Sequence, residues 1–192
     1  SIPAYNEADI INQTIENVLN QTFEDFELLV IDDGSTDNTA AVVSKYTDDP
    51  RVKYIYQENR GFPGARNTGL DEGDGDYYAF IGADDLWEPR KLERQVTLVE
   101  DTEIDMIHSN VHHINENNEI TGIRWDERPP STENRQTFVR ELFMRNFICI
   151  QSVLITRDEI VDRRFDETLG INCDHDMWLR TASTADVAYI DD

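Results

Sequence analysis

The sequence lacks long apolar runs. No window approaches the roughly 18 consecutive apolar residues that indicate a membrane-spanning helix, and the best runs, such as 28–31 and 147–150, are short. A transmembrane helix within this chain is therefore excluded.

Cysteine is also scarce. Cys149 and Cys173 are the only thiols, and their spacing is not that of a CxxC pair. Two cysteines make neither a disulfide framework nor a zinc site of that kind, so we expect a reducing compartment.

Basic residues are outnumbered by acidic ones, and lysine occurs only at Lys45, Lys53 and Lys91. The 192 residues hold 17 Lys and Arg against 40 Asp and Glu, which gives a net charge of −23. Such a field repels a phosphate polyanion and excludes a protein that coats DNA or RNA. Two origins of the acidity stay open. One is an ordinary acidic cytosolic protein, and the other is a halophilic protein whose counter-ions screen its self-repulsion.

The remaining composition is that of a folded domain. Hydrophobic residues make up 39% of the chain, which excludes a disordered acidic tail, and the length suits one domain with a real core. Residues 1–5 read as the end of a buried strand, and 189–192 read as a strand about to turn. We therefore expect both termini to be truncated.

Apolar periodicity predicts alternating strands and helices along the first half of the chain. Strands are expected over 26–31, 52–56, 76–81, 105–109 and 151–155, with a hairpin over 111–123. Helices are expected over 7–21 (capped by Asn6), 38–46, 65–70, 89–100, 137–146 and 174–184, with loops over 61–64 and 125–134.

This alternation predicts an α/β fold, with a parallel sheet and helices on both faces. Ligands bind such sheets beyond the carboxyl ends of the strands. Polar clusters follow three strand ends, at 5–7, 32–35 and 84–85, and we expect them to line one crevice. The alternation of strands and helices stops near residue 110. We therefore expect residues 1–110 and 111–192 to be two halves of one domain.

An ordered set of motifs spans nearly the whole chain. It comprises IPAYNE at 2–7, IDDGSTD at 31–37, NRG at 59–61, ARNTG at 65–69, ADD at 83–85, FDE at 165–167 and DHDMWLR at 174–180. The set resembles family 2 glycosyltransferases of the GT-A fold, whose central sheet is Rossmann-like and mostly parallel. The resemblance implies an inverting transfer of a sugar from a nucleotide-diphosphate donor, with UDP favoured, to an acceptor hydroxyl.

The resemblance assigns donor binding to the first strand ends. Asp33 would contact a uracil-like base, the backbone of Pro3, Ala4 and Tyr5 would cradle it, and Glu7 would lie close by. From the residues alone, the turn at 32–35 reads equally as a cap for the next helix.

Two adjacent acids, Asp84 and Asp85, end the strand at 76–81. Their mutual repulsion is relieved if a hard divalent cation bridges them to a diphosphate. By resemblance to the family's DXD element, Asp85 would hold Mg²⁺ or Mn²⁺, and Asp84 the ribose or the metal. Gly82 replaces the first acid of that element, and an acidic capping loop is the alternative.

Arg66 opens a predicted helix, where a guanidinium can pair with phosphate oxygens of the donor. In so acidic a chain it could instead only pair with a carboxylate. Residues 147–151 lie where acceptor-side loops occur in the family.

The resemblance makes Asp174 the general base, although Cys173 stands where the family usually has Glu. A helix cap is the alternative for Asp174, and Asp176 is a second candidate for the base. His175 could contact phosphate or metal, or could serve helix packing.

The implied partners are a nucleotide-diphosphate sugar and a glycan, glycolipid or lipid-linked acceptor. The expected location is the cytoplasm, with peripheral association at the inner face of the cell membrane left open. A sugar nucleotidyltransferase and a non-catalytic nucleotide-sugar-binding module are the rival functions. The former should carry a Gly-rich, basic loop after its first strand, and the sequence at 4–7 is neither.

Overall fold

Three parallel strands form the first sheet, in the order β1 (Ile2–Ala4), β2 (Leu28–Asp32) and β3 (Val52–Tyr56). The structure is a computed structural model that describes residues 1–125 and 128–191. All five residues of β2 are buried, as a strand between two parallel neighbours should be. The strand predicted over 52–56 is confirmed.

The second sheet has the order β4 (Tyr77–Ala79), β8 (Leu154–Thr156), β5 (Met106–Ser109) and β9 (Val187–Ile190). β8 is antiparallel to both β4 and β5, so those two strands run in the same direction. β9 is parallel to β5. The expectation of a mostly parallel sheet is confirmed, with β8 as the antiparallel member.

Backbone hydrogen bonds at Ser1 join the two sheets. The Ser1 amino group donates to the carbonyl of Ala79 (2.7 Å), and the Ile81 N–H donates to the carbonyl of Ser1 (3.1 Å). This alternation is the parallel pattern. The carboxyl ends of β1, β2, β4 and β5 therefore share one edge, and β8 brings its amino end to that edge.

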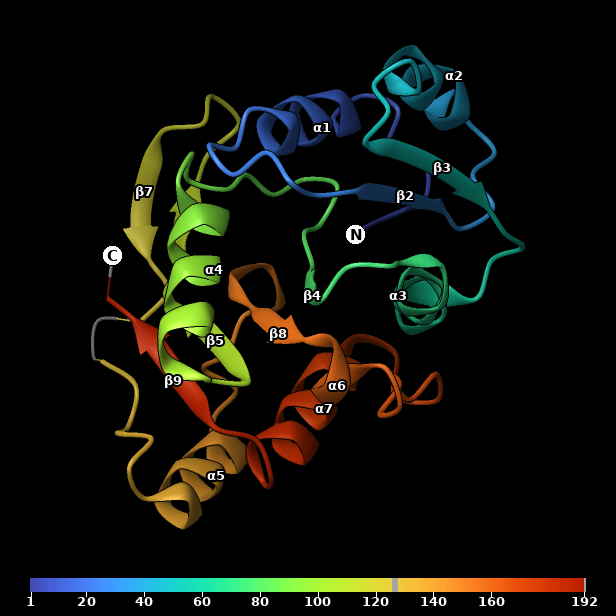
Figure 1. Cartoon of the computed structure of the whole chain (residues 1–192). Coiled ribbons are helices and arrows are strands. Elements are labelled where there is room, and N and C mark those ends of the chain that lie inside the picture. The colour runs from blue at the N-terminus through green and yellow to red at the C-terminus, as the bar shows by residue number, and fades with distance from the viewer. Residues whose placement is uncertain (126–127, 192) are drawn as a thin grey trace.

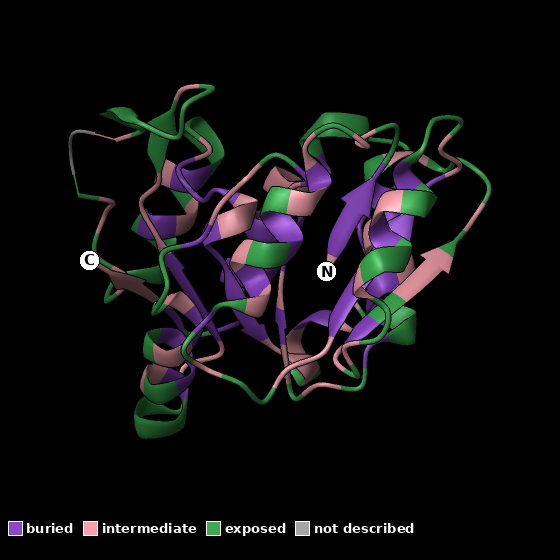
Figure 2. Ribbon diagram, turned by 90° about the horizontal axis from the view of Figure 1, so that it is seen from above, coloured by how far each residue is buried: buried purple, intermediate pink, exposed green. Residues whose placement is uncertain are grey.

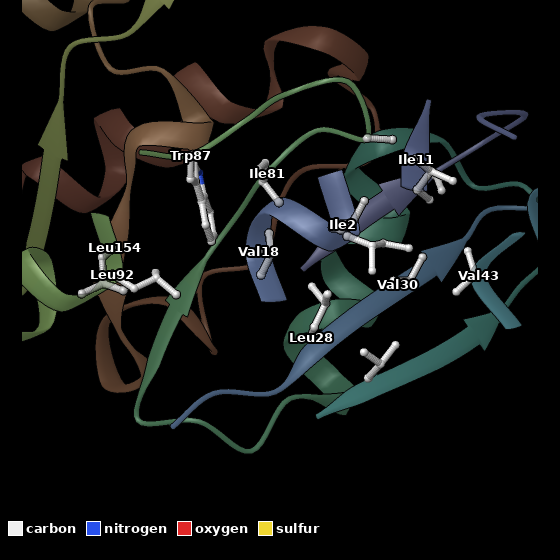
Figure 3. Close-up of a cluster of buried hydrophobic side chains, with 14 of the residues drawn as sticks. Ile2, Ile11, Val18, Leu28, Val30, Val43, Ile81, Trp87, Leu92 and Leu154 are labelled. Carbon is white, nitrogen blue, oxygen red and sulfur yellow. The ribbon is translucent and has the colours of Figure 1, made fainter. Parts of the chain in front are cut away.

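Helices cover both faces, as predicted. Side chains of α1 (Ile11–Leu19) and α4 (Lys91–Thr102) share one hydrophobic cluster with Ile107 and Leu154, part of which Figure 3 shows. The neighbouring Met106 and Ile155 belong to the opposite cluster, because successive strand residues point to opposite faces.

That second cluster packs against α5 (Arg135–Met144) and α7 (Cys173–Ala182), which contact each other. Trp178, fully buried, is at its centre beside Phe80 and Phe165. α3 (Gly61–Glu72) lies on the side of the first sheet opposite α1 (Figure 1).

The other elements are short. They are α2 (Thr39–Val43), α6 (Arg157–Ile160), the hairpin β6 (His112–Ile114) and β7 (Ile120–Ile123), and 3₁₀ turns at Ser44–Tyr46, Ile150–Ser152 and Gly170–Asn172. The predicted hairpin is confirmed, and its strands are exposed, whereas the strands of the two central sheets are largely buried (Figure 2).

Two local predictions are wrong. Asn6 does not cap α1, which begins at Ile11. Asn6 instead has a left-handed backbone (φ 59°), and its side-chain oxygen accepts from the Thr36 N–H (2.8 Å). Residues 61–64 are the first turn of α3 rather than a loop. The predicted loop over 125–134 includes 126–127, which lie outside the described residues.

Candidate active site

The carboxyl edge of the sheet carries the donor residues expected from the sequence. Pro3 and Ala4 are buried in β1, and the Ala4 carbonyl accepts from the Asp33 N–H at 2.8 Å. Tyr5 follows them and is 46% exposed. Burial raises the pKa of Glu7, and the charges of Asp84 and Asp37 raise it further. The charges of Asp84 and Asp37 therefore both act on Glu7 at this edge, where the Glu7 N–H donates to Thr39 Oγ1 at 2.9 Å.

Asp33 is buried, and its carboxylate holds the start of α3. One oxygen accepts from the Arg60 N–H (2.8 Å) and from Gln57 Nε2 (2.6 Å), and the other accepts from the Gly61 N–H (2.8 Å). The capping role considered for this turn is thus present, although on α3 rather than on the next helix along the chain. Contact with a nucleotide base stays a prediction.

Gly82 lets the two acids after β4 approach each other. A Cβ at Gly82 would lie 2.8 Å from a carboxylate oxygen of Asp84 and 2.8 Å from one of Asp85. The Gly82 N–H also donates to Asp85 at 3.2 Å. A side chain at this position would require both carboxylates to shift.

Asp85 is held in a partly buried position. Thr14 Oγ1 donates to the carbonyls of Ala83 (2.7 Å) and Asp85 (3.0 Å), and Gln151 Nε2 lies 3.4 Å from the Asp85 carboxylate. Burial raises the pKa of Asp85, and the neighbouring Asp84 raises it further, against the Gly82 N–H and the charge of Arg66. Gln151 reaches the site because β8 is antiparallel, a direction that the sequence pattern did not predict.

Arg66 extends from α3 toward α7. Its Nη1 lies 3.2 Å from Cys173 Sγ, and its guanidinium is over the ring of Phe165 at 5.6 Å. Its Nε is buried and has no hydrogen-bond partner among the described residues, nor does Arg66 form an ion pair with any carboxylate there. The alternative that Arg66 only pairs with an acid is therefore not seen.

Asp174 lies in the first turn of α7, next to Cys173. The buried Cys149 thiol connects it with the metal-side acid: burial raises the pKa of Cys149 to about 11, Arg124 opposes this, and the charges of Asp174 and Asp85 add to it. The charges of Asp85 and Asp174, which come from different halves of the chain, therefore both act on this one thiol.

Asp176, the second acid of α7, is held in an ion pair. Asp176 pairs with Arg180 (2.8 Å), whose guanidinium also donates to the carbonyls of Arg163 and Arg164. His175 Nε2 lies 2.7 Å from the Leu142 carbonyl, which is the packing role considered for it. Asp174 is thus left as the carboxylate of α7 without an ion pair among the described residues.

A cavity of about 310 Å³ lies elsewhere, at the amino ends of β2 and β4. Its lining includes Phe26, Leu28, Tyr77 and Leu92, and none of the predicted site residues. The strand-end acids therefore remain the candidate site.

The family model of glycosyl transferase family 2 matches residues 1–165. The chain belongs to this family. An uncharacterised family glycosyltransferase of Rickettsia conorii is 30% identical over 190 residues, which cover 99% of this chain and 31% of that protein.

A named relative is more similar over a shorter stretch. WfgD of Escherichia coli, a UDP-Glc:α-D-GlcNAc-diphosphoundecaprenol β-1,3-glucosyltransferase, is 40% identical over 122 residues, which cover 63% of this chain and 47% of WfgD. The chain thus spans less than half the length of either relative.

Solved structures confirm the GT-A fold. Residues 1–349 of Staphylococcus aureus TarS in complex with UDP match with a TM-score of 0.78 and 20% identity, over 100% of this chain and 56% of that one. The mannosyltransferase PcManGT of Pyrobaculum calidifontis, in complex with GDP-Man and Mn²⁺, matches with a TM-score of 0.73 and 20% identity, over 100% and 53%. Among residues 1–125 and 128–191, no helix has the length and apolar character needed to span a membrane.

Proposed function

We propose that the protein is an inverting glycosyltransferase that moves a sugar from a nucleotide-diphosphate donor to an acceptor hydroxyl. The observation that supports this proposal is that Asp85 and Arg66 both contact the second half of the chain: Gln151 Nε2 lies 3.4 Å from the Asp85 carboxylate, and Arg66 Nη1 lies 3.2 Å from Sγ of Cys173, the residue before Asp174. Family membership supplies the reaction class.

The donor would lie across the ends of β1 and β2. Its base would meet Asp33, the backbone of Pro3 to Tyr5 and the nearby Glu7, and Asp84 would face the ribose. UDP is favoured, because WfgD takes UDP-Glc and a TarS structure contains UDP-GlcNAc, although PcManGT is solved with GDP-Man.

The acids after β4 fit a Mg²⁺ or Mn²⁺ ion. Both carboxylates face the space over Gly82, and the pKa of Asp85 is raised by burial and then by the charge of Asp84, effects that a bound cation would offset. No third His, Cys, Asp or Glu completes a metal cluster in the described part of the chain, which suits an ion that takes its other ligands from a substrate diphosphate. Bound there, the ion would act as a Lewis acid on the departing diphosphate. Asp85, with Asp84, would hold it, and Arg66 would pair with the phosphate oxygens.

Asp174 would act as the general base. It takes the proton of the acceptor hydroxyl as that oxygen attacks the anomeric carbon. The bond from that carbon to the diphosphate breaks with its electron pair on the leaving group, and the configuration inverts in this single displacement. The acceptor would be a glycan, a glycolipid or a lipid-linked sugar. We propose a cytoplasmic enzyme that a lipid-linked acceptor would bring to the inner face of the cell membrane.

A thermal-shift screen of nucleotide sugars with Mn²⁺ tests the donor proposal, because a ligand that binds only the folded state raises the melting temperature (Tm). Slow hydrolysis of the stabilising sugar nucleotide would separate a catalyst from a non-catalytic binding module. Stabilisation by no nucleotide sugar would contradict the proposal.

A further inference from the structure

Three arginines gather around two aromatic rings beside the candidate active site. Arg124 and Arg145 both lie over the ring of Trp125, at 5.2 and 5.5 Å from its centroid, and Arg128 lies 5.7 Å from that of Tyr189. All three arginines are exposed, and none forms an ion pair with a carboxylate of the described residues. In a chain of net charge −23, these three arginines are therefore not engaged by the carboxylates of residues 1–125 and 128–191.

Trp125 is held in place at the end of β5. Asn110, which follows that strand, donates from Nδ2 to the Trp125 carbonyl (2.7 Å). The Trp125 indole N–H is buried and has no partner in the described part of the chain. Trp125, Arg145, Phe147 and Tyr189 line a small cavity of about 10 Å³ here. One ring therefore fixes two guanidinium groups from separate elements and offers a free donor beside them.

Arg124 lies on the same rim as the proposed base. Its charge lowers the pKa of the Cys149 thiol, the same group whose pKa Asp174 and Asp85 raise. The charges of Arg124 and Asp174 therefore both act on Cys149, whereas Arg66 belongs to α3 and Asp33 accepts from its first N–H groups.

We propose that Arg124, Arg145 and the Trp125 indole N–H form an anion subsite that holds a phosphate or diphosphate group of the acceptor. A guanidinium stacked on an aromatic face keeps its N–H donors free in its own plane, and those donors match phosphate oxygens. A strongly anionic protein would otherwise repel such an acceptor, so a local cationic site is needed. This inference rests on the proposed function and extends it to the chemistry of the acceptor.

Calorimetric titration of the protein, saturated with UDP and Mn²⁺ to occupy the donor site, tests the subsite. The probes are inorganic pyrophosphate, geranyl diphosphate and geraniol. We expect both diphosphates to bind and geraniol not to bind, and we expect Arg124→Gln combined with Arg145→Gln to weaken diphosphate binding about tenfold or more. Tighter binding of geranyl diphosphate than of pyrophosphate would assign the group to a lipid-linked acceptor, and equal binding would assign it to the diphosphate alone.

Arg140→Gln is the matched control, because Arg140 is an exposed α5 arginine that already pairs with Glu141. It makes the same Arg→Gln change, removing one positive charge where the double variant removes two, and should leave diphosphate binding unchanged. Equal loss in the control, unchanged binding in the double variant, or no binding by the wild-type protein would each overturn the subsite. UDP affinity is measured first. A protein that does not bind UDP would count against the proposed function alone, and the diphosphate titrations would still show whether Arg124 and Arg145 form an anion subsite.

Discussion

At the scale of single residues, Asp174 is distinguished from its neighbour Asp176 by what each carboxylate contacts. Asp176 is fixed by Arg180, and Asp174 shares the surroundings of Cys149 with Asp85. We expect Asp174→Asn to lower sugar transfer by about 10²–10⁴-fold, the usual contribution of a general base, with UDP affinity unchanged. Transfer rates with a saturating donor and calorimetric UDP titration measure the two effects.

Asp176→Asn is the control for this prediction, since it makes the same chemical change two residues further along the same helix. It should retain most of the transfer activity and lose only some stability. A wild-type rate in Asp174→Asn, or an equal loss in both variants, would contradict the assignment of the base.

Asp85 should reduce stability when no cation is bound. Burial and Asp84 raise its folded-state pKa above the unfolded value, so the ionised carboxylate disfavours folding. That penalty is absent below the unfolded pKa, grows as pH rises from the unfolded to the folded pKa, and is fully present above the folded pKa. Asp85→Asn should therefore raise the metal-free Tm at pH 7 and weaken Mn²⁺-dependent UDP binding. Scanning calorimetry with and without Mn²⁺ and UDP measures both, and a lower metal-free Tm would be inconsistent with this electrostatic account.

The sequence predicted that Asp33 belongs to the site, but not what orients it. The N–H donors to its carboxylate come from Arg60 and Gly61, far along the chain, and no local pattern reveals that contact. In the same way, Cys149 and Gln151 enter the site only through the packing of β8.

At the scale of elements, the start of α3 depends on Gly64. A Cβ at Gly64 would overlap the Cβ of Arg60, whose N–H holds Asp33. We expect Gly64→Ala to lower the free energy of unfolding by about 1–3 kcal/mol, as overpacking does, and to weaken UDP binding by displacing the Asp33 carboxylate. Urea unfolding and UDP titration measure these effects.

Gly122→Ala is the matched control, because a Cβ at Gly122, in β7, meets nothing within 4 Å. Its unfolding free energy should change by no more than about 0.5 kcal/mol. Equal stability of the two variants would argue against a tight helix start.

The first turn of the same helix could not be predicted from the local sequence. β3 was predictable because four of its five residues are β-branched or aromatic, and because polar residues bound it on both sides. Residues 61–64, with two glycines and a proline, carry a loop composition, and they form a helical turn because the buried Asp33 carboxylate accepts the N–H groups of Arg60 and Gly61.

At the scale of the whole molecule, the parallel alternation and its ligand-binding edge followed from the sequence pattern. The position of β8 between β4 and β5 did not, because pairing between strands far apart in sequence leaves no local periodicity. That insertion is what brings Gln151, in the segment predicted to be acceptor-side, to the rim beside Asp85.

The net charge of −23 makes the stability of the fold depend on salt. Molar KCl screens self-repulsion among the acids, so Tm should rise between low salt and molar KCl. Scanning calorimetry in a KCl series measures this. A Tm that does not change with KCl would remove the halophilic interpretation.

The most direct measurement of the central claim is a crystal structure of the protein soaked with UDP and Mn²⁺, with the anomalous signal of manganese recorded. The account predicts a manganese peak against the carboxylates of Asp84 and Asp85, with the diphosphate beside it and the uracil at Asp33. A manganese peak elsewhere, or UDP in the cavity lined by Phe26 and Tyr77, would contradict it.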